Sequence, residues 1–262
     1  MARKRKNVMA RTSKPNRADA PNASSRVEQL HGATALVTGG SRGIGRAIAL
    51  RLADLGARVA ICGRQQSALD ETLAALRKKG AAAEAIVADI TQPADVDKLI
   101  SAVETALGPI SILVNNAGVA TFAPFHEQTD ADWDIMLDTN LKSVFLVSRA
   151  AAKGMIQRGA GDIINISSLA GLNAFPGGAI YCASKWGLQG LSACMAEDLR
   201  GYGIRVSTIC PGSVATGFSG KSVEQKPNAL KPEDVAHAVA SIVTQAPNSF
   251  ISQLQIRPLK KA

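Results

Sequence analysis

Two residues four positions apart, Tyr181 and Lys185, can form a proton-transfer pair. Side chains with this spacing lie on one face of a helix, so the phenol and the ammonium group should be neighbours. A phenol with its ordinary pKa of about 10 is a weak base at neutral pH, but a nearby positive charge favours its ionised form. We therefore expect Lys185 to lower the pKa of Tyr181, which can then act as a general acid or base.

A serine, Ser168, follows an apolar run that ends at Ile166 and can assist this pair. Its hydroxyl can donate a hydrogen bond to a substrate oxygen on which negative charge develops. These groups suit proton transfer to or from a substrate oxygen, for which the protein supplies position and electrostatics. The adjacent Ser167 competes for the same role.

A glycine-rich segment, Thr38 to Gly45 (TGGSRGIG), lies directly between an apolar run and a helical pattern. Glycines permit a tight turn and a close approach of a pyrophosphate, and a helix N-terminus presents free N–H groups. A glycine cluster by itself is a weak signal, but this placement is typical of dinucleotide binding.

The end of the second apolar run indicates which dinucleotide binds. An acidic residue here would bind the adenosine ribose, but the run ends Ile61-Cys62-Gly63-Arg64 without one. Arg64, supported by Arg42, can instead pair with a 2′-phosphate. We therefore expect NADP(H) in preference to NAD(H); the alternative is that Arg64 is a solvated loop cation.

The elements that must position these groups alternate between short apolar runs and longer helical patterns. Near-continuous apolar character fits strands that are covered on both faces by helices. The alternation predicts an α/β Rossmann fold: one doubly wound, seven-stranded parallel sheet flanked by helices, with ligands at the carboxyl ends of the strands. The predicted strands are Thr34 to Val37, Arg58 to Cys62, Ala83 to Val87, Ile112 to Asn115, Ile163 to Ile166, Arg205 to Cys210 and Leu254 to Ile256.

Helix boundaries follow from glycine and proline. Pro93 suits the first turn of a helix, and Gly56, Gly80 and Gly108 fall where three helices should end.

Taken in order, these motifs resemble the short-chain dehydrogenases/reductases of the Ser-Tyr-Lys type, with the TGxxxGIG cofactor motif, from about Gly32 to Pro258. Each motif alone is weak, but the full ordered set is specific. The motifs are Thr38 to Gly45, Asp89-Ile90, Asn115 to Gly118, Asn140, Ser168, Tyr181 with Lys185, and Pro211-Gly212.

The resemblance implies roles for four residues. Tyr181 would be the general acid/base, and Lys185 would bind the nicotinamide ribose and modulate Tyr181. Asn140 would hold a water of the proton relay. Ser168 would orient the carbonyl; we prefer it to Ser167 because the family's serine commonly precedes its tyrosine by thirteen residues.

The resemblance also implies the cofactor contacts, with Asp89 at the adenine and Asn116 near the adenosine ribose. Pro211, Gly212, Val214 and Thr216 would lie along the nicotinamide. The remaining implied contacts are Gly39, Ser41, Arg42, Gly43, Ile44, Gly45, Arg64, Ile90, Gly118, Tyr181 and Lys185.

The substrate is less well indicated. A short lid should lie between Thr216 and a helix that begins near Pro232. Five aromatic residues are candidates either for the pocket wall or for the core. They are Phe122, Phe125, Phe175, Trp186 and Phe218.

Three functions stay open. The first is NADP(H)-dependent interconversion of a carbonyl compound and an alcohol, with small ketones or 3-hydroxy/3-oxo acids as substrates. The second is a 3-oxoacyl-acyl-carrier-protein reductase, although Ser252 to Pro258 replaces the glycine-rich ending of those enzymes. The third is a non-catalytic NADP(H)-sensing regulator, which would use the same glycine turn but usually lacks an intact Ser-Tyr-Lys set.

The net charge of +9 lies mostly at one end. Residues 1–26 hold eight basic residues against Asp19 alone, whereas the rest holds 22 basic and 20 acidic residues. We expect a disordered basic tail over residues 1–30 and one NADP(H)-binding domain over 31–262. The tail could instead be an organelle transit peptide or an anchor for nucleic acid or anionic lipid. Apart from nonspecific contact by the tail, nucleic-acid binding is not expected.

The scattered cysteines and histidines predict neither zinc ligation nor disulfides. We expect buried, reduced thiols, no metal site, no membrane span and a cytoplasmic location, unless the tail is a transit peptide. By analogy with the family we expect a homodimer or homotetramer packed through Trp133 to Arg158 and Ser184 to Leu199. The cysteines are Cys62, Cys182, Cys194 and Cys210, and the histidines His31, His126 and His237.

Overall fold

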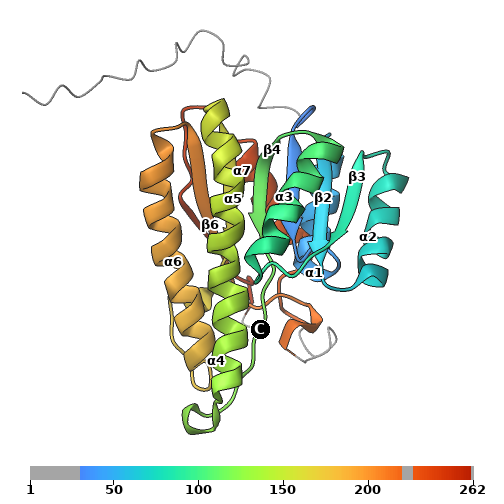
Figure 1. Cartoon of the computed structure of the whole chain (residues 1–262). Helices are drawn as coiled ribbons and strands as arrows, with labels where there is room; N and C mark the ends of the chain where they lie inside the picture. Colours follow the sequence, from blue (N-terminus) through green and yellow to red (C-terminus); the bar gives the residue numbers. More distant parts are fainter. Residues whose placement is uncertain (1–29, 220–226, 261–262) are drawn as a thin grey trace, which may run out of the picture.

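Seven parallel strands form one sheet in the order β3-β2-β1-β4-β5-β6-β7 (Figure 1). The computed structural model describes residues 30–219 and 227–260. The order changes direction at β1, with β2 and β3 on one side of it and β4 to β7 on the other, as in a doubly wound Rossmann fold. The strands are β1 (Thr34–Thr38), β2 (Arg58–Gly63), β3 (Ala83–Val87), β4 (Ile110–Asn115), β5 (Gly161–Ile166), β6 (Ile204–Pro211) and β7 (Gln253–Ile256). All seven predicted strands are therefore confirmed.

Helices cover both faces of the sheet, which explains the near-continuous apolar character of its central strands. One face packs against α1, α2 and α7, and the other against α3, α5 and α6, each with its own apolar core. The helices are α1 (Gly43–Asp54), α2 (Gln66–Lys78), α3 (Pro93–Leu107), α4 (Asp130–Leu137), α5 (Ser143–Arg158), α6 (Ala179–Arg200) and α7 (Pro232–Val243).

The predicted helix boundaries are confirmed. Pro93 is the first residue of α3, and Gly108 is its C-cap with a φ of 84°. Gly56 and Gly80 follow α1 and α2 with φ angles of 90° and 76°, which side chains disfavour.

The predicted basic tail and part of the predicted lid, residues 1–29 and 220–226, lie outside the described residues. Leu30, which we had assigned to the tail, is buried, and its N–H donates to the Leu55 carbonyl at 2.6 Å. The folded part therefore includes Leu30.

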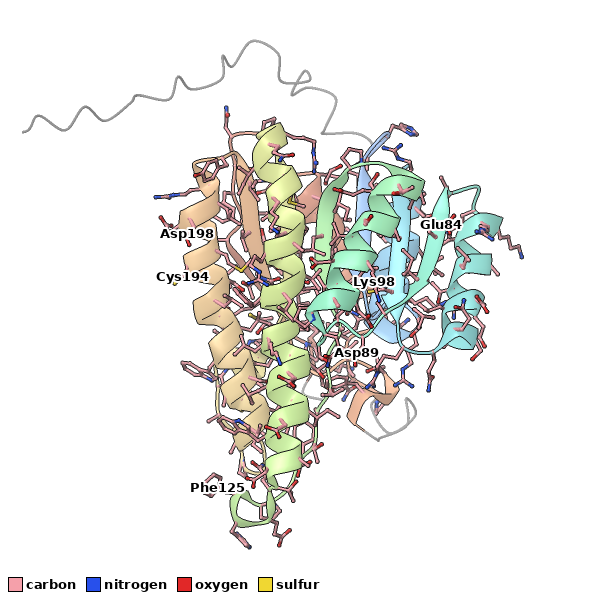
Figure 2. The ribbon with its side chains drawn as sticks, in the orientation of Figure 1. Glu84, Asp89, Lys98, Phe125, Cys194 and Asp198 are labelled. Carbon is pink, nitrogen blue, oxygen red and sulfur yellow. The ribbon has the colours of Figure 1, made fainter. Side chains whose placement is uncertain are left out.

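One expectation about the cysteines is wrong. Cys62, Cys182 and Cys210 are buried, but Cys194 is exposed on the outer side of α6 (Figure 2). Leu188, Ser192 and Ala196 mark the buried side of this helix at intervals of four. Since Cys194 lies two residues from Ser192, it points roughly the opposite way.

Within the described part of the chain, no group of three or more His, Cys, Asp or Glu side chains is arranged to hold a metal ion. None of the described helices combines the length and the apolar character needed to cross a membrane.

Candidate active site

The chemically interesting residues gather at the carboxyl edge of the sheet, in the turns that follow β1, β4, β5 and β6 (Figure 1). The N-terminal end of α6 brings Tyr181 to the same edge. Parallel strands all end on one side, so residues far apart in sequence meet there.

The turn after β1 has a backbone shape that requires glycine. Gly39 has a φ of 64°, and a Cβ at Gly45 would lie 2.2 Å from the Gly39 carbonyl oxygen. The N-cap of α1, Arg42, makes no side-chain cap hydrogen bond, and the first turn holds no acidic residue. The N-terminal N–H groups of α1 thus have no side-chain cap, and the turn fits a bound phosphate or pyrophosphate.

Asn116, after β4, holds this turn in place. Its side-chain amide donates to the carbonyls of Thr38 at 3.0 Å and Gly39 at 3.2 Å. The Thr38 hydroxyl accepts in return from the N–H groups of Asn116 and Ala117. Sequence reasoning did not single out Thr38 for this role, because a strand threonine gives no pattern of its own.

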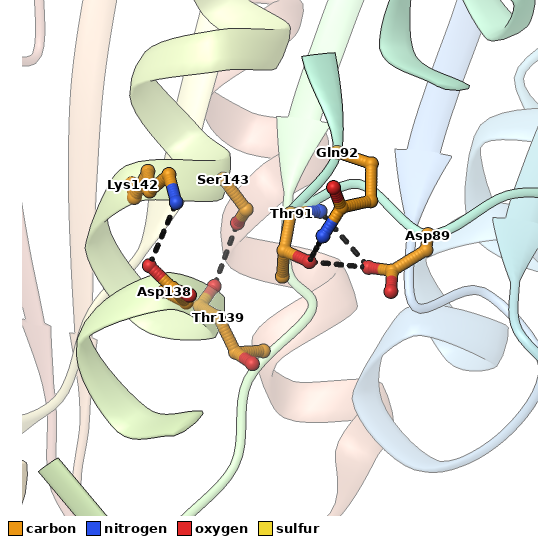
Figure 3. Close-up of polar contacts among 7 residues, drawn as sticks. All are labelled: Asp89, Thr91, Gln92, Asp138, Thr139, Lys142 and Ser143. Carbon is orange, nitrogen blue, oxygen red and sulfur yellow. Dashed lines mark hydrogen bonds and ion pairs between the residues drawn. The ribbon is translucent and has the colours of Figure 1, made fainter. Parts of the chain in front are cut away.

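The adenosine end of the candidate site carries positive charge. Arg42 and Arg64 are exposed, and no acidic residue ends β2. Asp89, after β3, accepts hydrogen bonds from the Thr91 N–H and hydroxyl at 3.0 and 2.7 Å (Figure 3). These bonds, with a smaller contribution from Arg64, lower the pKa of Asp89. The next residue, Ile90, is buried in the core beside α3.

Tyr181 and Lys185 lie together on the buried side of α6, with the Lys185 Nζ 5.9 Å from the tyrosine ring centre. The expected effect on Tyr181 is wrong in sign: burial raises its pKa to about 12, and a hydrogen bond with Ser168 opposes that rise only in part. Burial also lowers the pKa of Lys185 to about 8. The spacing correctly placed both groups on one face, but desolvation favours the neutral form of each.

The two serines differ in their partners. Ser168 hydrogen-bonds with Tyr181, and its hydroxyl accepts from the Ala170 N–H at 3.1 Å, which caps the short helix η5 (Leu169–Gly171). Ser167 is buried and accepts instead from the Gln189 amide at 3.1 Å. The geometry therefore joins Ser168, and not Ser167, to Tyr181.

Gln189 was missed by the sequence reasoning. One turn beyond Lys185, its amide also donates to the Cys210 sulfur at 2.9 Å, and its oxygen accepts from Gln253 at 3.2 Å. The side chain thus ties β5, β6 and β7 together beneath the site. A helix glutamine carries no sequence signal for this, since its partners lie on β6, on β7 and in the turn directly after β5.

Asn140 is fully buried in a π-helical turn, η4 (Asp138–Lys142), between α4 and α5. Its side chain accepts from the Val119 N–H and donates to the Val119 carbonyl and the Ser184 hydroxyl. Ser184 in turn donates to the Tyr181 carbonyl at 2.7 Å. Asn140 thus links the loop after β4 to α6. Such turns often mark functional sites; Figure 3 shows the Asp138–Lys142 and Thr139–Ser143 contacts within and just after this one.

The loop after β6 approaches the glycine turn. A Cβ at Gly43 would lie 3.4 Å from the Thr216 side chain. Pro211 ends β6 beside β7, and the Gly212 N–H donates to Ile256. Val214 is buried and pairs with Leu230.

Three of the five candidate aromatic residues lie around Tyr181. Phe122 and Phe218 have ring centres 5.6 and 6.2 Å from that of Tyr181, and Phe175 lies 5.6 Å from Phe122. Phe125 and Trp186 are exposed and point elsewhere; Phe125 lies at the far tip of the molecule (Figure 2). Gly118 lies between Asn140 and Phe218.

This arrangement can be compared with known proteins. The short chain dehydrogenase family matches residues 33–227, about three quarters of the chain. The chain belongs to the short-chain dehydrogenase/reductase family. It is accordingly an oxidoreductase of the alcohol/carbonyl type.

Relatives within this family differ in their substrates. The chain is 41% identical to gluconate 5-dehydrogenase of Gluconobacter oxydans, over 74% of this chain and 76% of that one. It is 38% identical to 2-(S)-hydroxypropyl-CoM dehydrogenase 3 of Xanthobacter autotrophicus, over 79% and 88%. A solved metagenomic short-chain oxidoreductase in complex with NADP is 42% identical, with a TM-score of 0.79, over 88% of this chain and 99% of that one.

Proposed function

We propose that this protein is an NADP(H)-dependent reductase/dehydrogenase that interconverts a carbonyl compound and an alcohol, with Tyr181 as general acid/base. The observation that carries the proposal is the contact of Tyr181 with both Ser168 and Lys185 at the edge that holds the glycine turn. Family membership supports the reaction class.

In the reducing direction, Tyr181 donates its proton to the carbonyl oxygen as the carbonyl carbon accepts a hydride. The bound nicotinamide cofactor supplies that hydride. Ser168 donates a hydrogen bond to the same oxygen, which stabilises the charge that develops there. The phenol holds its proton at neutral pH, which is the form that acts as an acid, and burial, which raises its pKa to about 12, makes that proton harder to release.

Lys185 has two parts in this proposal. Its Nζ donates to the Ile166 carbonyl at 3.0 Å, which fixes the side chain beside Tyr181. From there it can bind the nicotinamide ribose and, when protonated, stabilise the phenolate that forms as Tyr181 gives up its proton. Asn140 acts as a positioning residue, through Ser184 and the loop after β4.

For the cofactor, we propose NADP(H) in preference to NAD(H). The exposed guanidinium groups of Arg42 and Arg64 suit a 2′-phosphate, and β2 ends without the acid that a free ribose would need. Asp89 would meet the adenine. We retain the other contacts of the sequence analysis as part of this proposal.

We also propose that the protein is a homodimer or homotetramer that packs through α4, α5 and α6. A groove between these helices is lined mainly by apolar side chains, and Trp133 and Trp186 are exposed nearby on the same helices. Light scattering coupled to gel filtration tests this: a monomeric mass at micromolar concentration contradicts it.

The decisive experiment is NADPH oxidation at 340 nm with ketones, aldehydes, diketones, 3-oxo acids and acyl thioesters, with NADH in parallel. We expect turnover that is faster with NADPH and is lost in Tyr181→Phe. Tyr202→Phe, which changes the exposed tyrosine, is the matched control and should keep full activity. Tight NADPH binding without any turnover would instead favour the sensing regulator.

A further inference from the structure

Three phenylalanines form a cluster beside Tyr181, the proposed proton donor. Phe122 meets the Tyr181 ring edge-on, with an interplanar angle of 85°, and Phe218 lies on it at 57°. Tyr181 is 8% exposed, but Phe122, Phe175 and Phe218 are 43%, 41% and 43% exposed. A compound whose carbonyl reaches the Tyr181 hydroxyl can therefore place a substituent against these partly exposed rings.

Two of these rings, Phe122 and Phe175, lie on loops that hydrogen-bond to each other. The Ala123 N–H donates to the Gly177 carbonyl, and the Gln128 amide donates to the carbonyls of both residues at 3.0 and 3.1 Å. These bonds join the loop that carries Phe122 to the loop that carries Phe175. The Phe175 ring lies over Gly178, where a Cβ would come within 2.4 Å of the ring. Pre-organised aromatic surface binds apolar groups at a low cost in conformational entropy.

The segments that carry these rings contain no charged residue. Residues 117–124, 167–178 and 212–218 lack Asp, Glu, Lys, Arg and His. Asp132 hydrogen-bonds with Thr121, in the loop that carries Phe122, but its side chain is itself an anion. The ammonium group of Lys185 is buried and donates to the Ile166 carbonyl. Among the described residues, the segments that carry these rings therefore offer no cation to a carboxylate or sulfonate on the substrate.

We propose that the substrate is an uncharged ketone that carries an aryl or similarly apolar group, together with the corresponding secondary alcohol. The proposal rests on the proposed function, which it narrows. In the reduction, the carbonyl carbon gains a hydride from NADPH and the oxygen gains the Tyr181 proton; the alcohol and NADP⁺ leave, and Tyr181 regains a proton from solvent. The aryl group stacks on Phe122 and Phe218. Among the substrates expected from the sequence, this favours ketones over 3-oxo acids.

The test compares methyl 4-acetylbenzoate with 4-acetylbenzoate, which share a reacting ketone and a ring but differ in charge. A second comparison, of kcat/KM for cyclohexyl methyl ketone and for acetophenone, tests whether the substrate needs an aromatic ring. We expect kcat/KM to be at least about tenfold higher for the ester than for the acid, since a desolvated carboxylate without a partner is costly. We expect the aryl ketone to exceed the cyclohexyl ketone about threefold or more. Equal or faster turnover of the acid would overturn the proposal.

Substitutions test whether the substrate preference arises from these rings. Phe122→Leu and Phe218→Leu should each lower kcat/KM for acetophenone about three- to tenfold, whereas Phe125→Leu, which changes a 79% exposed ring outside the cluster, should not. Phe122→Arg should reduce the ester-to-acid preference by providing the missing cation. Because these rings are partly exposed, the variants should fold, which circular dichroism checks.

Failure of the proposed function has a different signature. No NADPH consumption with any ketone would remove the reductase, and calorimetric binding of the ester and the acid to the NADPH-loaded protein then tests the ring surface alone. Tighter binding of the ester, weakened by Phe122→Arg, supports the neutral aromatic surface. Binding of the acid as tightly as the ester, or of neither, overturns it.

Discussion

The two sides of Tyr181 are built in different ways. On the cofactor side, one continuous turn provides the shape, through glycine φ angles and N–H groups, and Asn116 and Thr38 brace it. On the substrate side, three rings from three separate loops provide the surface, and about two fifths of each ring remains exposed. A backbone-built site tolerates few substitutions, whereas a side-chain surface can change its preference without loss of the fold. Relatives of one family can therefore share a cofactor turn and differ in substrate.

The largest effect should come from Gly45→Ala. Its Cβ would lie 2.2 Å from the Gly39 carbonyl oxygen and 2.5 Å from the Asn116 amide nitrogen, so the turn and its brace must both move. We expect NADPH binding, measured by fluorescence titration, to weaken at least about 100-fold, because the phosphate approaches this backbone closely.

Gly190→Ala is the matched control, since its Cβ would meet nothing within 4 Å and it lies inside α6. It should bind NADPH normally and gain up to about 1 kcal/mol in stability. If Gly45→Ala bound NADPH as well as this control does, the backbone-built half of the comparison would fail.

Ser168→Ala should leave the cofactor-binding turn intact and slow the chemical step. Without the hydroxyl that contacts Tyr181, kcat should fall about 10²-fold or more, while the NADPH dissociation constant stays unchanged. Ser167→Ala, which removes a hydroxyl bonded to Gln189 instead, should lose far less activity. Steady-state kinetics that ranked the two serines the other way round would reverse their assignment.

Arg64→Ala should alter only the choice of cofactor. Loss of a charge-assisted bond to the 2′-phosphate should raise the NADPH dissociation constant about tenfold and leave that of NADH nearly unchanged. Arg200→Ala removes the same charge from the far end of α6, where it forms an exposed ion pair with Glu197, and is the control. An equal loss for NADH and NADPH would show that Arg64 does not read the phosphate.

The smallest expected effect concerns Lys185, the buried lysine beside Tyr181, between the cofactor side and the substrate side. The pKa of Lys185 is about 8 in the folded protein, below the ordinary value of 10.5. Between these values the unfolded chain binds more protons than the folded one, so the free energy of unfolding should rise as pH increases. The rise should approach about 1.4 kcal/mol per pH unit. Urea unfolding of the parent protein and of Lys185→Met at pH 7.5 and 9.5, without cofactor, measures this contribution as a difference, because the buried thiols of Cys62 and Cys210, whose pKa values burial raises from 9.0, lower the stability of both proteins in the upper part of this window.

Lys185→Met should lack this rise. The raised pKa of Tyr181 acts with the opposite sign, because stability is lost as pH climbs from about 10 to 12, and therefore does not interfere in the lower window. Identical pH dependence in the variant and the parent protein would mean that Lys185 keeps its ordinary pKa.

How much the sequence determined depends on how local each feature is. Strand and helix positions, the glycine turn and the family came from the sequence, because apolar period and backbone conformation depend on neighbouring residues. The seven strands and the ends at Gly56, Gly80 and Gly108 follow from that local chemistry. Spacing by itself also placed Tyr181 and Lys185 on one face of α6.

Only the tertiary structure decided which groups surround Tyr181 and Lys185 on this face of α6. Burial sets the pKa values of Tyr181 and Lys185 against the simple charge argument, since desolvation depends on every element packed around them. The same holds for Gln189, which bonds to β6, β7 and the turn after β5, and for Phe122, Phe175 and Phe218, which looked no different from Phe125 in the sequence. Contacts between segments that lie 21 to 64 residues apart depend on how the whole chain folds, and no local pattern records them.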